Sequence, residues 1–145
     1  MAVAASMALT VPAEGLRFYA YRDPAAIPTI CSGHTKGVYM GQHATPEECQ
    51  RFLEEDTKEA MDAVLRYTVV PLNENELGAY TDFTLNLGSE KFRTSTLLRY
   101  LNAGNRDAAC KQLLRWVYAG GQKYQGLVNR RNKEYALCMK PSEIQ

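Results

Sequence analysis

The sequence predicts an α+β fold in which a short β-containing segment is followed by helices. Residues 17–39 are interrupted by two prolines and two glycines and carry strand-forming tyrosines and isoleucines. Two helix-start signals follow at Thr45 and Asn73, each a capping residue with an acid three positions later. Beyond them, apolar residues recur at helical spacing, so we expect the second half of the chain to be entirely helical.

The first helix is expected over residues 45–67. Thr45 is the predicted cap, Pro46 suits the first helical position, and Glu48 is placed to reach back to Thr45. Apolar residues then follow at helical spacing, and Asp56 lies on the same stripe. A helix of this length is able to connect two lobes of a domain.

Four further helices are expected, separated by glycines. The boundaries predicted for them are about 73–87, 95–102, 106–117 and 127–137. Gly88, Gly104 and the pair Gly120-Gly121 mark the ends.

The size and composition fit one compact domain. The chain has 145 residues, 46% of them hydrophobic, and shows no repeat or linker. We therefore expect a single domain, 1–145, with a β-containing lobe over about 15–44, the connecting helix over about 45–67 and a helical lobe over about 68–145.

The charge balance excludes a strong electrostatic attraction to nucleic acid. Seventeen basic and sixteen acidic residues leave a formal net charge of +1. The apolar start, Met1 to Val11, is too short to span a bilayer and contains no Lys or Arg that would form the basic region of a signal peptide, so we expect no stable membrane span. Either a short helix on the core or the remnant of a removed export or anchor segment would account for it.

The cysteines allow two interpretations. The chain contains four, two in each half: Cys31, Cys49, Cys110 and Cys138. In an oxidising compartment they permit two disulfides, with three possible pairings. The alternative is a zinc site made of Cys31, His34, His43 and Cys49, which the irregular H-x5-C spacing disfavours.

Two acids near the start are candidates for glycoside hydrolysis. This reaction needs one protonated carboxyl to protonate the leaving oxygen and one ionised carboxylate to activate water or stabilise the sugar cation. Glu14 follows an apolar segment, and Asp23 lies in a wetter loop, which would separate their pKa values in the required sense. Taken alone, two such acids are more often surface residues.

The segment around these acids resembles the catalytic segment of phage-type lysozymes (endolysins). The matching residues are Glu14-Gly15-Leu16-Arg17, Tyr21-Arg22-Asp23 and Pro28-Thr29-Ile30-Cys31-Ser32-Gly33-His34-Thr35, with the spacing E-x8-D-x5-T. The resemblance continues through Asn86-Leu87-Gly88 and Gly126-Leu127-Val128-Asn129-Arg130-Arg131, and it is closest to the cysteine-containing endolysins of lambdoid phages. It implies a lysozyme-like fold, with a small β-containing lobe and a larger helical lobe on either side of a cleft.

The resemblance also implies an activity and the residues for it. Glu14 would be the acid, Asp23 the carboxylate that positions water, and Thr29 the hydroxyl that assists it. The reaction would be inverting hydrolysis of the β-1,4 bond between N-acetylmuramic acid and N-acetylglucosamine in bacterial peptidoglycan, with no cofactor and no metal. We expect a monomer that is made in the host cytoplasm and acts in the periplasm or cell wall, by an export route left open.

Three further residues match family positions that line the cleft. The resemblance suggests that Arg130 orients Glu14, that Asn129 supports the site or a saccharide, and that Asn86 hydrogen-bonds a sugar. The simpler interpretations are a solvated charge on a helix for Arg130 and a helix C-terminal residue for Asn86.

His34 and Asp56 are expected to form a structural ion pair. An acid on an apolar helix stripe needs a partner, and the family resemblance pairs these two residues. This contact would bring Cys31 close to Cys49, so we expect disulfides Cys31–Cys49 and Cys110–Cys138, the second between adjacent helices.

Two alternatives to a hydrolase remain at this point. A lytic transglycosylase cleaves the same bond by intramolecular attack, and it would need neither Asp23 nor Thr29. A non-catalytic cell-wall-binding module would not need Glu14.

Overall fold

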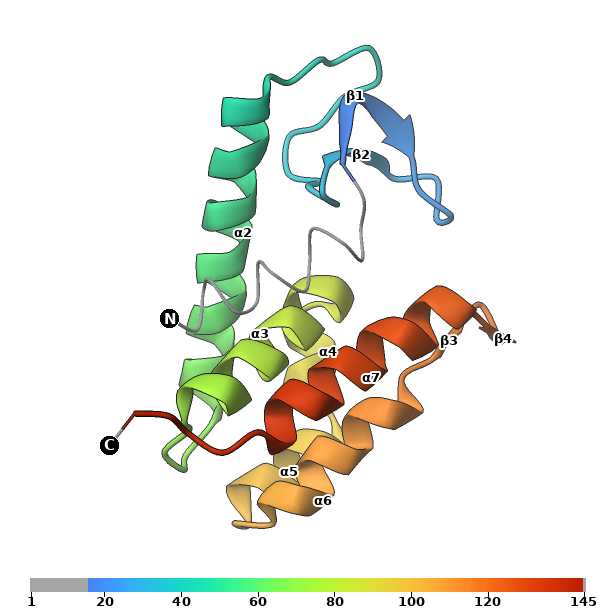
Figure 1. The fold of residues 1–145 in the computed structure, drawn as a ribbon. Helices are drawn as coiled ribbons and strands as arrows, with labels where there is room; N and C mark the ends of the chain where they lie inside the picture. Colours follow the sequence, from blue (N-terminus) through green and yellow to red (C-terminus); the bar gives the residue numbers. More distant parts are fainter. Residues whose placement is uncertain (1–15, 145) are drawn as a thin grey trace.

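The first two strands lie beside one end of the longest helix, and most of the remaining helices gather toward its other end (Figure 1). The computed structural model describes residues 16–144. The elements in chain order are β1 (Arg17–Arg22), β2 (Pro28–Cys31), α2 (Pro46–Tyr67), α3 (Glu74–Leu87), α4 (Ser89–Arg93), α5 (Thr96–Asn102), α6 (Arg106–Gln112), the 3-10 turn η1 (Leu113–Arg115), β3 (Tyr118–Ala119), β4 (Gln122–Lys123) and α7 (Gln125–Met139). The predicted α+β class is confirmed.

The two strongest helix-start predictions are confirmed. At the start of α2, the Thr45 hydroxyl accepts from the Glu48 amide at 3.1 Å, and the Glu48 carboxylate accepts from the Thr45 amide at 3.0 Å. Asn73 and Glu76 make the same reciprocal pair at the start of α3. Each pair satisfies amide groups that have no partner inside the helix.

The expectation of an entirely helical second half was wrong. The chain between α6 and α7 forms an antiparallel hairpin in which Tyr118 pairs with Lys123 and Ala119 with Gln122. Gly120 and Gly121 have φ values of 57° and 79°, a backbone conformation that reverses the chain and that glycine adopts without strain. The two glycines therefore form a hairpin turn where we expected a simple break between helices.

Two helical boundaries also differ from the prediction. The helix expected over 106–117 ends at Gln112 and continues only as the 3-10 turn η1. The short helix α4, which directly follows Gly88, was not predicted. With only five residues, α4 is too short to show a helical period in the sequence.

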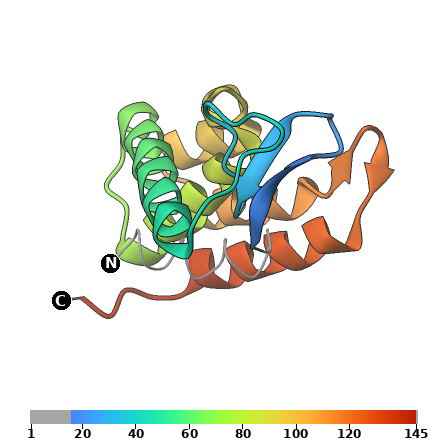
Figure 2. The ribbon, with the colours of Figure 1, turned by 90° about the horizontal axis from the view of Figure 1, so that it is seen from above.

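The first strands form a two-stranded antiparallel sheet. Tyr21 pairs with Thr29 and Arg22 with Pro28, so residues 23–27 make the connecting turn. The chain then returns along β1, where Ala20 and Phe18 exchange backbone hydrogen bonds with residues 42–44. Both views place the β3–β4 hairpin on the same side of the molecule as the β1–β2 turn, away from α2 (Figures 1 and 2).

Two separate hydrophobic cores lie in the described part of the chain. The larger core is formed by the helices and consists of Val64, Ala79, Tyr80, Phe83, Phe92, Leu97, Leu98, Leu101, Ala109, Cys110, Leu113 and Cys138. The smaller core lies between the sheet and the start of α2 and consists of Ile30, Cys31, Ala44 and Cys49. α2 contributes to both cores and so joins the β segment (residues 16–44) to the helical segment (residues 68–144).

Candidate active site

Asp23 is held by the turn between β1 and β2. Its Oδ1 atom accepts hydrogen bonds from the amides of Ala25 and Ile27, both at 2.8 Å. The Asp23 amide donates to the Ile27 carbonyl at 3.0 Å, which closes the turn. Within residues 16–144, Oδ2 has no hydrogen-bond partner and the side chain is partly exposed, so this oxygen remains able to accept a proton or a hydrogen bond.

Thr29 is connected to the same turn. Its hydroxyl donates to the Ile27 carbonyl at 2.8 Å and is largely buried. Ile27 therefore joins the two candidate residues, because its amide binds the Asp23 carboxylate and its carbonyl binds the Thr29 hydroxyl. Since the Thr29 proton is used in this bond, the lone pairs of its oxygen are left to accept from a water or a substrate.

The predicted acid, Glu14, lies outside the described residues. The apolar segment from Met1 to Val11 does so as well. The position of Glu14 relative to Asp23 and Thr29 therefore stays a prediction.

Arg130, expected to face the acid, makes a buried two-point contact with Asp82 on α3. Its Nε and Nη2 atoms each donate to one carboxylate oxygen at 2.9 Å, and both side chains are almost fully buried. The simpler interpretation of Arg130 as a solvated charge is therefore wrong. The geometry fixes the guanidinium, because a paired carboxylate and guanidinium restrict each other in both distance and plane.

Asn86 and Asn129 are placed differently from one another. The side-chain oxygen of Asn86 accepts a hydrogen bond from Arg131 at 2.9 Å, so this oxygen is already used in a contact within the protein. Asn129 is exposed and accepts from Gln125, one turn earlier on α7. Their proposed contacts with a saccharide are not tested by this geometry.

A buried charged cluster was missed by the sequence analysis. The cluster consists of Asp82, Arg130, Arg131 and Glu134, which join α3 to α7. The Arg131 guanidinium lies 2.7 Å and 2.8 Å from the two Glu134 oxygens, and both side chains are fully buried. The sequence did contain a pattern that indicates these ion pairs. Glu134 follows Arg130 by four residues and Arg131 by three, on the face of α7 that carries Cys138.

Burial dominates the electrostatics of this cluster. It raises the pKa of the Glu134 carboxyl well above its ordinary value, and the adjacent Asp82 carboxylate acts in the same direction against the two arginines. It also lowers the pKa of Arg131, which Glu134 opposes. Burial thus favours the neutral form of both groups, and their oppositely charged partners favour the charged form.

His34 and Asp56 are in contact, as expected. The His34 Nδ1 atom lies 2.6 Å from Asp56 Oδ2, and the imidazole stacks on the Phe52 ring with the centroids 4.1 Å apart. Asp56 is less buried than the sequence suggested, with 18% of its side chain exposed, so the contact lies at the edge of the core. Lys36 and Glu59 form a second, exposed ion pair between the same loop and α2.

The two expected disulfides are present. Cys31 is bonded to Cys49, between β2 and α2, and Cys110 to Cys138, between α6 and α7. The alternative zinc site is therefore wrong, because the first disulfide uses both of its thiols. Among the described residues, no cluster of histidine, cysteine and acidic side chains is arranged to hold a metal ion.

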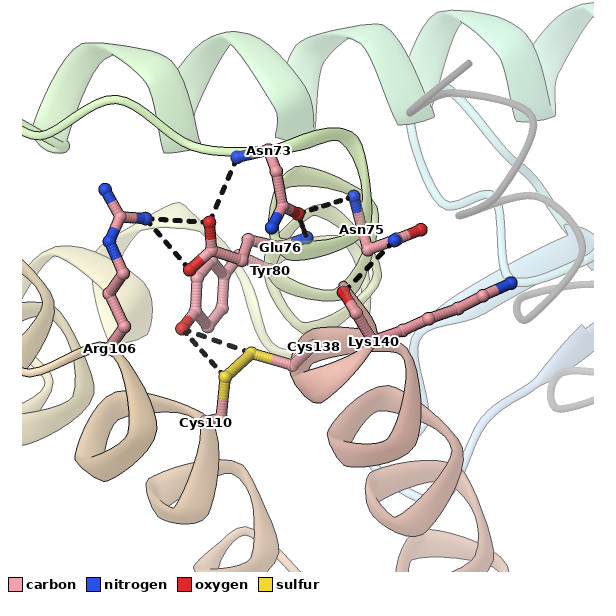
Figure 3. Close-up of a disulfide and its surroundings, with 8 residues drawn as sticks. All are labelled: Asn73, Asn75, Glu76, Tyr80, Arg106, Cys110, Cys138 and Lys140. Atoms are coloured by element: carbon pink, nitrogen blue, oxygen red, sulfur yellow. Dashed lines mark hydrogen bonds and ion pairs between the residues drawn. A yellow bond between two sulfur atoms is a disulfide. The ribbon is translucent and has the colours of Figure 1, made fainter. Parts of the chain in front are cut away.

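Polar groups surround the second disulfide (Figure 3). The buried Tyr80 hydroxyl lies 3.3 Å from Cys138 Sγ and 3.7 Å from Cys110 Sγ, and it is the donor because disulfide sulfurs carry no hydrogen. One turn before Tyr80, Glu76 binds Arg106 at 2.7 Å. The ends of α3, α6 and α7 are thus tied together at one place.

Within the region that the structure covers, no helix has both the length and the apolar character needed to cross a membrane. The long helix α2 carries charged residues throughout its length.

Comparisons with known proteins identify the family of the chain. The family model for phage lysozyme matches residues 12–134. The chain is 45% identical to a SAR-endolysin of Pseudomonas phage phiKMV, over 97% of this chain and 90% of that protein. It is 38% identical to the SAR-endolysin of Enterobacteria phage P21, over 93% of this chain and 86% of that protein.

Solved structures share the fold. The muramidase domain of SpmX from Asticaccaulis excentricus is 31% identical and has a TM-score of 0.86, over 94% of this chain and 96% of that one. A mutant of P22 lysozyme is 36% identical and has a TM-score of 0.79, over 93% and 95% of the two chains. From the family match, these relatives and the shared fold, we conclude that the chain belongs to the phage lysozyme family.

Proposed function

We propose that this protein is an endolysin that hydrolyses the β-1,4 bond between N-acetylmuramic acid and N-acetylglucosamine of peptidoglycan with inversion. The observation that carries the proposal is the arrangement of Asp23 and Thr29 around Ile27. Family membership supports the class of substrate, because the relatives are endolysins and lysozymes.

The turn suits the activation of a water molecule. Two backbone amides occupy Asp23 Oδ1 and leave Oδ2 as the acceptor. A water between Oδ2 and the Thr29 oxygen would donate one hydrogen to each, which directs its lone pair toward the sugar. This arrangement makes Asp23 the general base of an inverting hydrolysis.

The inverting course needs a separate acid on the opposite side of the bond. We assign this role to Glu14, which would protonate the leaving oxygen as the bond breaks. Arg130, fixed by Asp82, would orient Glu14, and Asn86 and Asn129 would contact the saccharide. The proposed place of action is the periplasm and cell wall of the infected host, where hydrolysis weakens the wall and leads to lysis.

The decisive experiment compares Glu14→Gln with the wild type on purified peptidoglycan. An amide cannot deliver the proton, so activity should fall by about 10²-fold to 10⁴-fold while the circular dichroism spectrum is unchanged. Near-normal turnover would refute the assignment of the acid. Glu47→Gln, an exposed change on α2, is the matched control and should retain full activity.

The products distinguish this proposal from its competitors. Mass spectrometry should find reducing-end muropeptides, whereas a lytic transglycosylase would give anhydro products and a binding module would give none. Nuclear magnetic resonance of fresh products should show the α-anomer that inversion of a β-bond requires.

Two changes probe the water site itself. Asp23→Asn should lose most of the activity, because the amide is no longer a base. Thr29→Glu would place a carboxylate where the water is held and is expected to shift the course toward a covalent intermediate with retention. An active Thr29→Glu variant that gives only the inverted product would contradict the placement of water at Thr29.

A further inference from the structure

A buried carboxyl group lies beside the arginine that would orient the catalytic acid. The Oε2 atom of Glu134 is 3.9 Å from the Nε atom of Arg130, and the two side chains are 0% and 4% exposed. Arg130 is bound on the same guanidinium by both oxygens of Asp82, each at 2.9 Å. Hydrolysis as proposed uses Arg130 and leaves Glu134 without a role.

Arg131 holds Glu134 in this position. Its guanidinium lies 2.7 Å and 2.8 Å from the two oxygens of Glu134. The same guanidinium donates to the side-chain oxygen of Asn86 at 2.9 Å and lies 5.4 Å from the centre of the Phe83 ring. Since Asn86 and Phe83 belong to α3, Arg131 is fixed by both helices. A Glu134 side chain that turned away would leave this buried guanidinium without its carboxylate.

The net charge of the cluster depends on Glu134. The two arginines carry +2 together. Asp82 carries −1, because it accepts two hydrogen bonds from Arg130 in the geometry of an ionised carboxylate. The cluster is therefore neutral when Glu134 is ionised, and it has a charge of +1 when Glu134 is protonated.

The groups that face Glu134 act in opposite directions. Burial and the Asp82 carboxyl raise the pKa of Glu134, whereas Arg131 and Arg130 lower it. The two other helical elements packed on α7 are α6 and η1, and their charged side chains lie at partly or fully exposed positions: Arg106, Asp107, Lys111 and Arg115. Glu134 is thus the member of the cluster through which its charge changes with pH.

We propose that Glu134 is a positioning residue for hydrolysis, whose carboxylate compensates Arg131 so that Arg130 brings no excess positive charge to the catalytic acid. The inference rests on the proposed function, in which Arg130 orients Glu14. A nearby positive charge favours the ionised form of a carboxyl group. A general acid must hold its proton until the bond breaks, so a neutral cluster suits Glu14 and a cluster of charge +1 does not.

The first test is the pH dependence of kcat/KM for Glu134→Gln on purified peptidoglycan. The amide keeps the size of the side chain but holds the cluster at +1 at every pH, so Glu14 should lose its proton at lower pH. The fall of kcat/KM on the basic side of the profile reports the ionisation of the general acid. This basic limb should move to lower pH by about one pH unit, a loss of about tenfold on the limb, while the acidic limb stays in place. Glu143→Gln, the same change at an exposed position, should leave the profile unchanged.

A double variant separates charge from structure. Glu134→Gln together with Arg131→Gln removes one charge of each sign, so the remaining pair of Arg130 and Asp82 is neutral. The basic limb should return toward its wild-type position, although more contacts are lost than in the single variant. A limb that stays displaced in a folded double variant would contradict the electrostatic role.

A titration that does not depend on catalysis follows the side-chain carboxyl of Glu14. Glutamate is labelled with carbon-13 at this carboxyl, and the Glu14 resonance is identified by its absence from Glu14→Gln. Its midpoint should lie about one pH unit lower in Glu134→Gln than in the wild type. Equal midpoints overturn the inference, whether or not the double variant folds.

The outcomes distinguish this inference from the proposed function. A loss of kcat/KM in Glu134→Gln that is equal at all pH values, or an unchanged profile, overturns the role of Glu134, while hydrolysis by the wild type still supports the muramidase. A wild type that releases no product, or near-normal turnover by Glu14→Gln, overturns the proposed function instead.

Discussion

The β segment and the helical segment are stabilised in different ways. In the described structure, the hydrophobic core between the β segment and the start of α2 has four buried members, whereas the core of the helices has twelve. The β segment compensates with a disulfide and a His34–Asp56 contact, both of which end on α2. The helical segment also has a disulfide, but it buries a cluster of four charged side chains between α3 and α7.

The comparison shows what the size of a core allows. A small core excludes too little water to hold a segment by itself, so cross-links to a helix become decisive. A large core can accommodate buried charges, provided that each has a partner with suitable geometry. The following predictions test this contrast.

The largest loss of stability is expected from Asp82→Asn. Removing this carboxylate leaves the buried Arg130 without its two-point partner, which should cost about 3–5 kcal/mol. Asp107→Asn, the same change at an exposed position of α6, is the control. Urea unfolding measures both, and a loss at Asp82 no larger than that at Asp107 would show that Asp82 and Arg130 add nothing to stability.

The two disulfides should contribute similar stabilisation energies, but their removal should destabilise different parts of the molecule. They close loops of 18 and 28 residues, and the chain-entropy model gives about 3–4 kcal/mol for each. Replacing Cys31 and Cys49 by serine should expose the β segment to proteolysis while the helical segment stays folded. Replacing Cys110 and Cys138 should lower the stability of the helical core itself. Hydrogen exchange resolved by residue checks this difference, and identical exchange patterns in the two variants would contradict it.

A smaller effect is expected from Asp56→Asn. The His34–Asp56 contact is short but partly exposed, so its loss should cost about 1.5–3 kcal/mol. A double-mutant cycle with His34→Gln isolates the energy of the pair from the stacking of His34 on Phe52. A coupling energy of zero would mean that stacking alone holds the histidine.

The smallest expected effect is a dependence of the free energy of unfolding on pH, caused by the titration of Glu134. Its pKa is raised above the ordinary value of 4.5, so the folded protein keeps this proton at pH values where the unfolded chain has lost it. The contribution of Glu134 to stability is therefore present below about 4.5 and is lost as the pH rises toward the raised pKa.

Glu134→Gln removes this titration and keeps an acceptor for Arg131. The free energy of unfolding of the variant, relative to the wild type, should increase as the pH rises above 4.5. Urea unfolding from pH 4 to pH 8 measures the difference, with Glu143→Gln as an exposed control. A relative stability that instead falls with pH would show that Arg131 lowers the pKa of Glu134 more than burial raises it.

The sequence by itself determined most of the fold. The capping pairs at Thr45 and Asn73 are local, since every atom involved lies within four residues, and both helices begin where they were predicted. The catalytic candidates Asp23 and Thr29 also lie within one short segment, and the hairpin register brings both to the same turn. The His34–Asp56 contact could be predicted from the sequence because an acid on an apolar helix stripe requires a partner.

Tertiary structure decided the features that depend on contacts between distant residues. The positive charges of Arg130 and Arg131 are typical of a solvated helix face, and only the packing of α7 on α3 places Asp82 and Asn86 against them. A groove beside α2, lined by the loop of residues 33–36 and by Gly88, likewise depends on the packing of two segments distant in the sequence, which no local pattern encodes. Local rules determine where helices begin because their interactions lie within one turn, whereas the environment of a charge is set by whichever side chains the completed fold places around it.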